Sequence, residues 1–254
     1  MLEQHVFDGK VALVTGAAGG LGRAVALKLA TLGADLCLVD LNSALLQETA
    51  EAAQRMGRTA EVVSADLSRP DNCALAVERA VARFGRLDAL CNVAGVLHFT
   101  RFADMPAAQF QATVAVNLQA PFLLSQAAIP HLLAAGGAIV NVASSAAFIG
   151  EAYLAAYAAS KAAIVSLTKS LAMEYAKSPL RVAAVAPGGM ATGMGGGIES
   201  LADQIDLSLV QRYTGLRGLV PVEDVAEMIA LLASDKGAAF HGSCVQMDAG
   251  ITAG

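Results

Sequence analysis

The chain has 254 residues with a formal net charge of −5, and 56% of its residues are hydrophobic. This length fits one large α/β domain or two small ones, and the apolar surplus favours a sheet buried on both faces. The acidic balance, without a cluster of lysines or arginines, argues against a nucleic-acid partner. No apolar stretch reaches the roughly 18 residues of a membrane span, and the N-terminus carries no secretory signature. We therefore expect a cytoplasmic protein with no membrane partner.

The cysteine pattern also favours a cytoplasmic protein. Cys37, Cys73, Cys91 and Cys244 are far apart and show no metal-ligand spacing. We expect buried, reduced thiols in a cytosolic protein and no metal site.

Strand and helix patterns alternate along the whole chain. Apolar strands are predicted at 10–15, 35–40, 59–65, 87–91, 138–143, 181–186 and 243–248. Helices are predicted at 23–32, at 43–56 with Ser43 as candidate N-cap, at 70–84, in two stretches within 105–135, in a run that contains Tyr157 and ends near 177, and at 222–233. This alternation predicts a single α/β domain over 1–254, a doubly wound, Rossmann-type, seven-stranded parallel sheet with helices on both faces. The stretch 188–218 is long for a connection, which predicts a mobile substrate loop.

A glycine-rich turn, Thr15 to Gly22, lies between the first strand and the first helix. Gly16 can form the tight turn, Gly20 lets the backbone approach a pyrophosphate, and Gly22 lets helix and strand pack closely. The helix start then presents free N–H groups to that anion. The context of strand, turn and helix predicts a dinucleotide site.

The second strand ends at Asp40, followed by Leu41 with no adjacent lysine or arginine. A carboxylate at this position can hold two ribose hydroxyls and would repel a 2′-phosphate. The expected cofactor is therefore NAD rather than NADP.

Tyr157 and Lys161 are four residues apart in a predicted helix, so their side chains share one face. A fixed positive charge beside a phenol favours the phenolate and lowers its pKa. The pair is a plausible proton-transfer device near neutral pH.

Taken together, these motifs resemble those of the short-chain dehydrogenase/reductase family over nearly the whole chain. The TGxxxGxG turn of that family matches Thr15 to Gly22, its YxxxK pair matches Tyr157 and Lys161, and its PGxxxT segment matches Pro187 to Thr192. Its NNAG segment matches Asn92-Val93-Ala94-Gly95, with Val93 in the second place, and its C-terminal Asp-Gly-Gly is Asp248-Ala249-Gly250 here.

The resemblance implies further site residues. The family serine lies thirteen residues before the tyrosine, at Ser144, although Ser145 is adjacent, and the family's active-site asparagine matches Asn117. Asp66 and Leu67 match the segment that holds the adenine. The expected cofactor-binding residues are Gly16, Gly20, Leu21, Gly22, Asp40, Leu41, Asp66, Leu67, Asn92, Ala94, Gly95, Tyr157, Lys161, Pro187, Gly188, Met190 and Thr192.

The implied activity is NAD-dependent interconversion of a secondary alcohol and a ketone. Tyr157 is expected to take the hydroxyl proton, Ser144 to donate a hydrogen bond to the substrate oxygen, and Lys161 to tune Tyr157 and hold the nicotinamide ribose. Asn117 is expected to fix a water beside Lys161.

Three loop residues that follow strand ends, His98, Glu151 and Tyr153, are candidates for substrate contact together with Ser144. Two other functions are compatible with the sequence: an NADP(H)-dependent carbonyl or 3-oxoacyl reductase, and a non-catalytic dinucleotide-binding sensor. The resemblance also implies a homo-oligomer, a tetramer or dimer, formed through the helices near 107–135 and 152–177.

Overall fold

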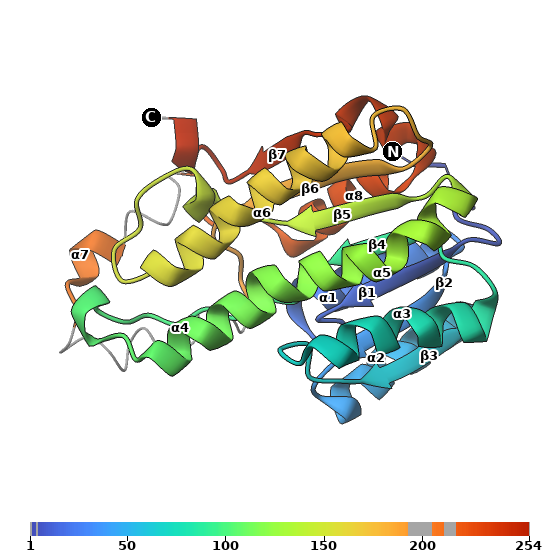
Figure 1. Ribbon diagram of the computed structural model, residues 1–254, viewed down its shortest axis with the longest axis horizontal. Coiled ribbons are helices and arrows are strands. Elements are labelled where there is room, and N and C mark those ends of the chain that lie inside the picture. The colour runs from blue at the N-terminus through green and yellow to red at the C-terminus, as the bar shows by residue number, and fades with distance from the viewer. Residues whose placement is uncertain (1, 4, 193–204, 211–216, 254) are drawn as a thin grey trace.

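A seven-stranded parallel sheet forms the centre of the molecule in the computed structural model, which describes residues 2, 3, 5–192, 205–210 and 217–253 (Figure 1). The order of the strands across the sheet is β3-β2-β1-β4-β5-β6-β7. Strands β2 and β3 are added on one side of β1, and strands β4 to β7 on the other side. Because the strand order reverses between β1 and β4, a crevice opens at the carboxyl ends of these two strands. The strands are β1 (Val11–Thr15), β2 (Asp35–Asp40), β3 (Ala60–Ser64), β4 (Ala89–Asn92), β5 (Ala138–Val142), β6 (Arg181–Pro187) and β7 (Cys244–Met247).

Helices cover both faces of the sheet, as predicted (Figure 1). The helices of one face are α1 (Gly20–Thr31), α2 (Ser43–Arg55) and α8 (Val222–Ala233). Those of the other face are α3 (Pro70–Phe84), α5 (Ala120–Ala135) and α6 (Ala155–Glu174), and α4 (Ala107–Val114) leads into α5.

Every residue of β1, β4 and β5 is buried, and most of them are aliphatic. Side chains alternate between the two faces along each strand, so Val14 packs with the α1 side and Leu13 with the α3 side. Burying one such side chain contributes roughly 1.5–3 kcal/mol to the stability of the fold. This burial holds the strands that carry the site in place.

Some predicted helix ends were wrong. The N-cap of α2 is Asn42 rather than Ser43, because the Oδ1 atom of Asn42 accepts a hydrogen bond from the N–H of Leu45 at 3.1 Å. Helix α1 begins at Gly20, inside the glycine-rich turn. Helix α6 ends at Glu174, before the predicted end at Lys177.

The two predicted helical stretches between 105 and 135 form one continuous helical run. A π-helical turn, η2 (Ala115–Gln119), joins α4 to α5 and carries Asn117. By length and composition alone this run, Ala107–Ala135, could cross a membrane, but a core helix that packs on a sheet has the same properties.

Only part of the predicted substrate loop at 188–218 can be described. Met190 pairs with Val220 in an isolated parallel bridge, and a short helix, α7, spans Leu207–Val210. Residues 193–204 and 211–216 lie outside the described residues, so the mobility of the loop stays a prediction.

Candidate active site

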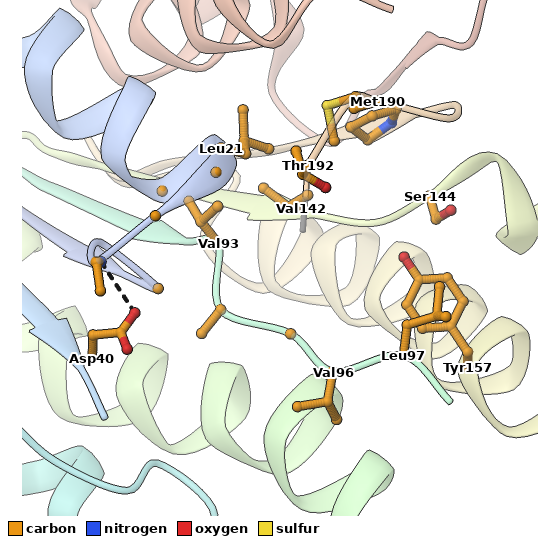
Figure 2. A pocket seen from close by; sticks show the side chains of 18 of the residues that line it. Leu21, Asp40, Val93, Val96, Leu97, Val142, Ser144, Tyr157, Met190 and Thr192 are labelled. Atoms are coloured by element: carbon orange, nitrogen blue, oxygen red, sulfur yellow. Dashed lines mark hydrogen bonds between the residues drawn. The ribbon is translucent and has the colours of Figure 1, made fainter. Parts of the chain in front are cut away.

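A cavity of about 550 Å³ opens at the carboxyl ends of β1, β2, β4, β5 and β6 (Figure 2). This is the edge at which parallel α/β sheets bind ligands. Its lining consists of Gly16, Ala18, Gly19, Gly20, Leu21, Gly22, Asp40, Asn42, Leu45, Val93, Ala94, Gly95, Val96, Leu97, His98, Val142, Ala143, Ser144, Tyr157, Lys161, Pro187, Gly188, Met190 and Thr192.

The glycine-rich turn needs its glycines for two physical reasons. Gly16 has a φ of +70°, and a Cβ atom there would lie 3.0 Å from the Cα atom of Ala94. A Cβ atom on Gly22 would lie 2.0 Å from the carbonyl oxygen of Gly16. The start of α1 therefore packs directly against the turn, as predicted. Gly20, Leu21 and Gly22 of this first helical turn line the cavity, and the first N–H groups of a helix have no partner within the helix.

Asp40 lies at the other end of the cavity from Tyr157 (Figure 2). Its Oδ2 atom accepts a hydrogen bond from the N–H of Ala18 at 3.1 Å, and its Oδ1 atom accepts one from the N–H of Asn42 at 3.0 Å. A carboxylate has about four acceptor positions, so both oxygens can still accept ligand hydroxyls. Asp40 thus orients the glycine-rich turn and offers a negative charge to the cavity.

Thr15 fixes the end of β4 beside this turn. Its buried Oγ1 atom accepts hydrogen bonds from the N–H groups of Val93 and Ala94, each at 3.0 Å. The segment after β4 is therefore held against β1, and it forms the floor of the cavity between Asp40 and Tyr157.

Asn117 does not line the cavity. Its side chain is 1% exposed and bonds both main-chain groups of Val96, accepting from the N–H at 2.8 Å and donating to the carbonyl at 2.9 Å. It also donates to the Oγ atom of Ser160 on α6 at 3.1 Å. These bonds use both N–H donors of the side-chain amide, so Asn117 positions the cavity wall and α6.

Tyr157 and Lys161 are both buried side chains on one face of α6, as their spacing predicts. The Nζ atom of Lys161 lies 5.7 Å from the centroid of the Tyr157 ring and donates a hydrogen bond to the carbonyl of Val142 at 2.8 Å. Figure 2 shows the phenol beside Ser144 at the end of the cavity.

Burial dominates the ionisation of this pair. It raises the pKa of Tyr157 to about 12, hydrogen bonding to Ser144 acts in the opposite direction, and the charge of Glu151 adds a smaller increase. Burial also lowers the pKa of Lys161 to about 8. The expected depression of the Tyr157 pKa by Lys161 is therefore not seen in the protein alone, where burial sets the direction of the shift and Ser144 is the group that opposes it.

The structure distinguishes the two adjacent serines. Ser144 lines the cavity, and its Oγ atom accepts a hydrogen bond from the N–H of Ala146 at 3.2 Å. That bond leaves the hydroxyl proton of Ser144 free to be donated. Ser145 is 3% exposed and is not part of the lining.

Most of the predicted cofactor residues come together in this cavity, but several lie elsewhere. The Nδ2 atom of buried Asn92 donates to the Oδ1 atom of Asn141 at 2.9 Å, inside the protein. Leu41 is 69% exposed, Leu67 is buried in the core, and Asp66 accepts a hydrogen bond from the N–H of Ser68. The predicted cofactor residues outside the lining are thus Leu41, Asp66, Leu67 and Asn92.

The substrate candidates also separate. His98 lines the cavity, whereas Glu151 and Tyr153 do not. Burial raises the pKa of Glu151 to about 7, and the hydroxyl of Tyr153 accepts a hydrogen bond from the N–H of Asp206 at 2.9 Å.

Nine residues of the lining were not predicted from the sequence. Asn42 and Leu45 come from the start of α2, directly after Asp40, and their position beside that strand end was a usable signal. The other missed residues are mostly apolar, and in a sequence they look like any core residue. They are Ala18, Gly19, Val93, Val96, Leu97, Val142 and Ala143.

The fold and this cavity define an α/β protein of the Rossmann type, with a glycine-rich turn at one end of the cavity and a tyrosine–lysine pair at the other. The sequence profile described as enoyl-(acyl carrier protein) reductase matches residues 16–252. The cis-4-hydroxycyclohexanecarboxylate dehydrogenase of Sinomonas cyclohexanicum is 36% identical over 251 residues, which cover 98% of this chain and 99% of that protein.

Two solved structures extend the comparison. A short-chain dehydrogenase from Mycobacterium paratuberculosis bound to NAD matches with a TM-score of 0.92 and 28% identity, over 98% of this chain and 99% of that one. A short-chain dehydrogenase from Burkholderia cenocepacia J2315 in complex with NADP has a TM-score of 0.87 and 32% identity, over 96% and 98%. The chain belongs to the short-chain dehydrogenase/reductase family and is an oxidoreductase of that type.

Proposed function

We propose that this protein interconverts a secondary alcohol and a ketone by NAD-dependent hydride transfer, with Tyr157 as the catalytic acid and base. One observation carries the proposal. Ser144, Tyr157 and Lys161 line the same cavity as the glycine-rich turn and Asp40. A dinucleotide held by the turn and by Asp40 would share its cavity with a hydroxyl, a phenol and an ammonium group. The relative from Sinomonas cyclohexanicum is named as a dehydrogenase of a ring alcohol, which supports alcohol oxidation as the reaction class.

The charges of the cavity favour NAD. Of the described lining residues, Lys161 is the one lysine or arginine, and its Nζ atom lies 5.7 Å from the centroid of the Tyr157 ring. Figure 2 shows Tyr157 at the end of the cavity opposite Asp40. A 2′-phosphate beside Asp40 would meet a carboxylate and no cationic partner, whereas ribose hydroxyls can donate to the free acceptor positions of its oxygens. The structure from Burkholderia cenocepacia holds NADP, so NADP(H) remains the alternative that the experiment below must exclude.

The residues around the phenol support proton transfer in both directions. With its pKa raised to about 12, Tyr157 is protonated at neutral pH in the protein alone and can act as the acid in ketone reduction. Alcohol oxidation needs the phenolate, which positive charge nearby favours. When bound, the nicotinamide supplies the hydride chemistry, and its oxidised ring is cationic. Ser144 donates to the substrate oxygen, where negative charge builds in the transition state.

Lys161 and Asn117 hold this arrangement in place. The ammonium group of Lys161 is anchored by the carbonyl of Val142 and lines the cavity, where it would hold the nicotinamide ribose. Asn117 acts as a positioning residue, because it ties Val96 of the cavity wall to Ser160 on α6, the helix that carries Tyr157.

The assay that tests the proposal measures nicotinamide reduction at 340 nm with a panel of secondary alcohols and with NAD⁺ or NADP⁺. We expect turnover with at least one alcohol and a kcat/KM for NAD⁺ at least about 100-fold above that for NADP⁺. Turnover with NADP⁺ alone would identify the carbonyl or oxoacyl reductase. Dinucleotide binding without turnover of any alcohol or ketone would favour the sensor function.

We also propose a cytoplasmic homo-oligomer, a dimer or tetramer. Long helices at the surface of the sheet support the assembly: Phe110 on α4, Phe122 on α5 and Met173 on α6 expose large apolar side chains. Light scattering after size-exclusion chromatography measures the oligomer mass, and a monomer at micromolar concentration would contradict this part of the proposal.

A further inference from the structure

Tyr153 adopts a backbone conformation that its side chain disfavours. Its φ is +66°, in the left-handed region, where a residue other than glycine costs about 1–2 kcal/mol. Such strain persists only where the surrounding structure holds the residue in place, and it is concentrated at functional sites. Tyr153 also lies four residues before Tyr157, at the entrance to α6.

Two hydrogen bonds hold Tyr153 between two other chain segments. Its carbonyl oxygen accepts from the N–H of Thr100, in the loop after β4, at 3.0 Å. Its phenolic oxygen accepts from the N–H of Asp206, directly before α7, at 2.9 Å. Figure 1 shows α7 beside the loop between β5 and α6 that carries Tyr153. One residue thus joins three segments that follow β4, β5 and β6.

The neighbouring contacts place this junction next to Tyr157, at the end of the cavity away from Asp40. Leu154, the next residue, is 2% exposed and belongs to the same apolar cluster as Tyr157, against which Leu97 and Phe99 pack. The dinucleotide end of the cavity, at Asp40, lies on the opposite side (Figure 2).

The segment that Tyr153 holds has its own local order. The Oδ1 atom of Asp206 accepts from both the N–H and the hydroxyl of Ser208, which shapes the start of α7. Ile205 is buried, while Leu207 and Leu209 on α7 are about two-fifths exposed. A half-exposed apolar pair on a docked segment can contact the carbon skeleton of a substrate.

We propose that Tyr153 is a positioning residue for the substrate, whose hydroxyl docks the segment Ile205–Val210 against the substrate side of Tyr157. The role rests on the proposed alcohol chemistry, but the docking bond itself does not. Tyr153 therefore acts on the part of a substrate that lies beyond the carbinol group, and it leaves dinucleotide binding unaffected. The sequence predicts a direct contact of Tyr153 with substrate, and this stays a prediction; in the structure its phenolic oxygen accepts the N–H of Asp206.

The first test is hydrogen–deuterium exchange of the full-length protein without substrate. Tyr153→Phe removes the acceptor oxygen and keeps the ring, so we expect the amides of 205–210 to exchange at least two-fold faster than in the wild type. Tyr175→Phe, the same change at the far end of α6, is the control and leaves these amides unchanged. Unchanged exchange in Tyr153→Phe overturns the proposal, whatever the fate of the proposed alcohol chemistry.

The second test is the split between KM and kcat. With cyclohexanol as probe, Tyr153→Phe is expected to raise the alcohol KM by about two- to ten-fold with little change in kcat. Propan-2-ol is too small to extend beyond the carbinol group, so its KM should change by less than about two-fold. The KM for NAD⁺ should also change by less than about two-fold. A fall in kcat with both alcohols, or an unchanged KM for cyclohexanol, contradicts the positioning role.

A double-mutant cycle separates this bond from a general effect on folding. Asp206→Pro removes the N–H donor, and Asp206→Asn keeps it and serves as the control. If the bond carries the effect, Tyr153→Phe raises KM for cyclohexanol in the Asp206→Asn background and has no further effect in Asp206→Pro. Equal, additive effects in both backgrounds overturn the proposal.

Discussion

The ammonium of Lys161 and the phenol of Tyr157 are both withdrawn from water, with the Nζ atom 5.7 Å from the ring centroid. Burial disfavours the charged form of each group, so it raises the pKa of the phenol and lowers that of the ammonium. Evolution retains such an arrangement where function needs it, so activity and stability should respond in opposite directions when the charge is removed.

Lys161→Met tests this opposition. We expect kcat/KM for the alcohol to fall on the order of 100-fold or more, since the variant loses the charge that favours the phenolate. The pKa of Lys161 is about 8 in the folded protein and about 10.4 in an unfolded chain, so the unfolded state binds more protons between these values. The free energy of unfolding of the wild type, relative to the variant, should therefore rise with pH across this window by up to about 3 kcal/mol.

Urea denaturation of both proteins at pH 7, 8, 9 and 10 measures this difference. If the free energy of unfolding of the wild type falls relative to Lys161→Met between pH 8 and 10, burial does not destabilise the ammonium.

Asp40→Ser tests the coenzyme preference. The change removes the carboxylate charge and most of the acceptor positions offered to the ribose, so we expect the KM for NAD⁺ to rise by roughly 10- to 100-fold. The preference for NAD⁺ over NADP⁺ should shrink by a similar factor, because the repulsion of a 2′-phosphate disappears as well. Asp40→Asn keeps the shape and loses the charge, which separates the two effects. An unaltered coenzyme preference in both variants would show that Asp40 does not select the coenzyme.

Gly22→Ala and Gly19→Ala form a matched pair for the glycine-rich turn. An alanine Cβ at 22 would lie 2.0 Å from the carbonyl oxygen of Gly16, whereas nothing lies within 4 Å of a Cβ at 19. Gly19 has an extended backbone that alanine adopts readily, with φ −163°. We expect Gly22→Ala to destabilise the protein by about 3 kcal/mol or more and Gly19→Ala by less than about 1 kcal/mol. Thermal unfolding measures both, and equal shifts in Tm would disprove the close approach.

The sequence predicted the parts of the site whose residue types carry a physical requirement. Gly16, Gly22, Asp40, Tyr157 and Lys161 occupy the predicted places because a tight turn, a close approach or a charge leaves few alternatives. The seven strands and their order of appearance were likewise readable, since each is a short apolar run bounded by a turn signal.

The side-chain directions of two asparagines could not be predicted from the sequence. Asn117 and Asn92 match motif positions, yet their amides are used inside the protein, by Val96 and Asn141 respectively. A motif match gives a position along the chain, and it does not say which way a side chain points. Only the packing of η2 against the segment after β4, and of β4 beside β5, decides that.

The positive φ of Tyr153 could not be predicted from sequence either. Nothing in the local sequence favours a left-handed tyrosine, and the conformation depends on partners at Thr100 and Asp206, more than fifty residues away in both directions along the chain. Long-range contacts of this kind override local preference.

The central claim is that the hydroxyl of Tyr157 carries the proton of the reaction. Tyr157→Phe removes that hydroxyl with little change of shape, and Tyr175→Phe makes the same change at the end of α6, outside the cavity lining. In steady-state assays with NAD⁺ and the best alcohol of the panel, we expect kcat/KM to fall on the order of 1,000-fold for Tyr157→Phe and less than about two-fold for Tyr175→Phe, with NADH affinity retained in both. Turnover by Tyr157→Phe within about ten-fold of the wild type would contradict the account.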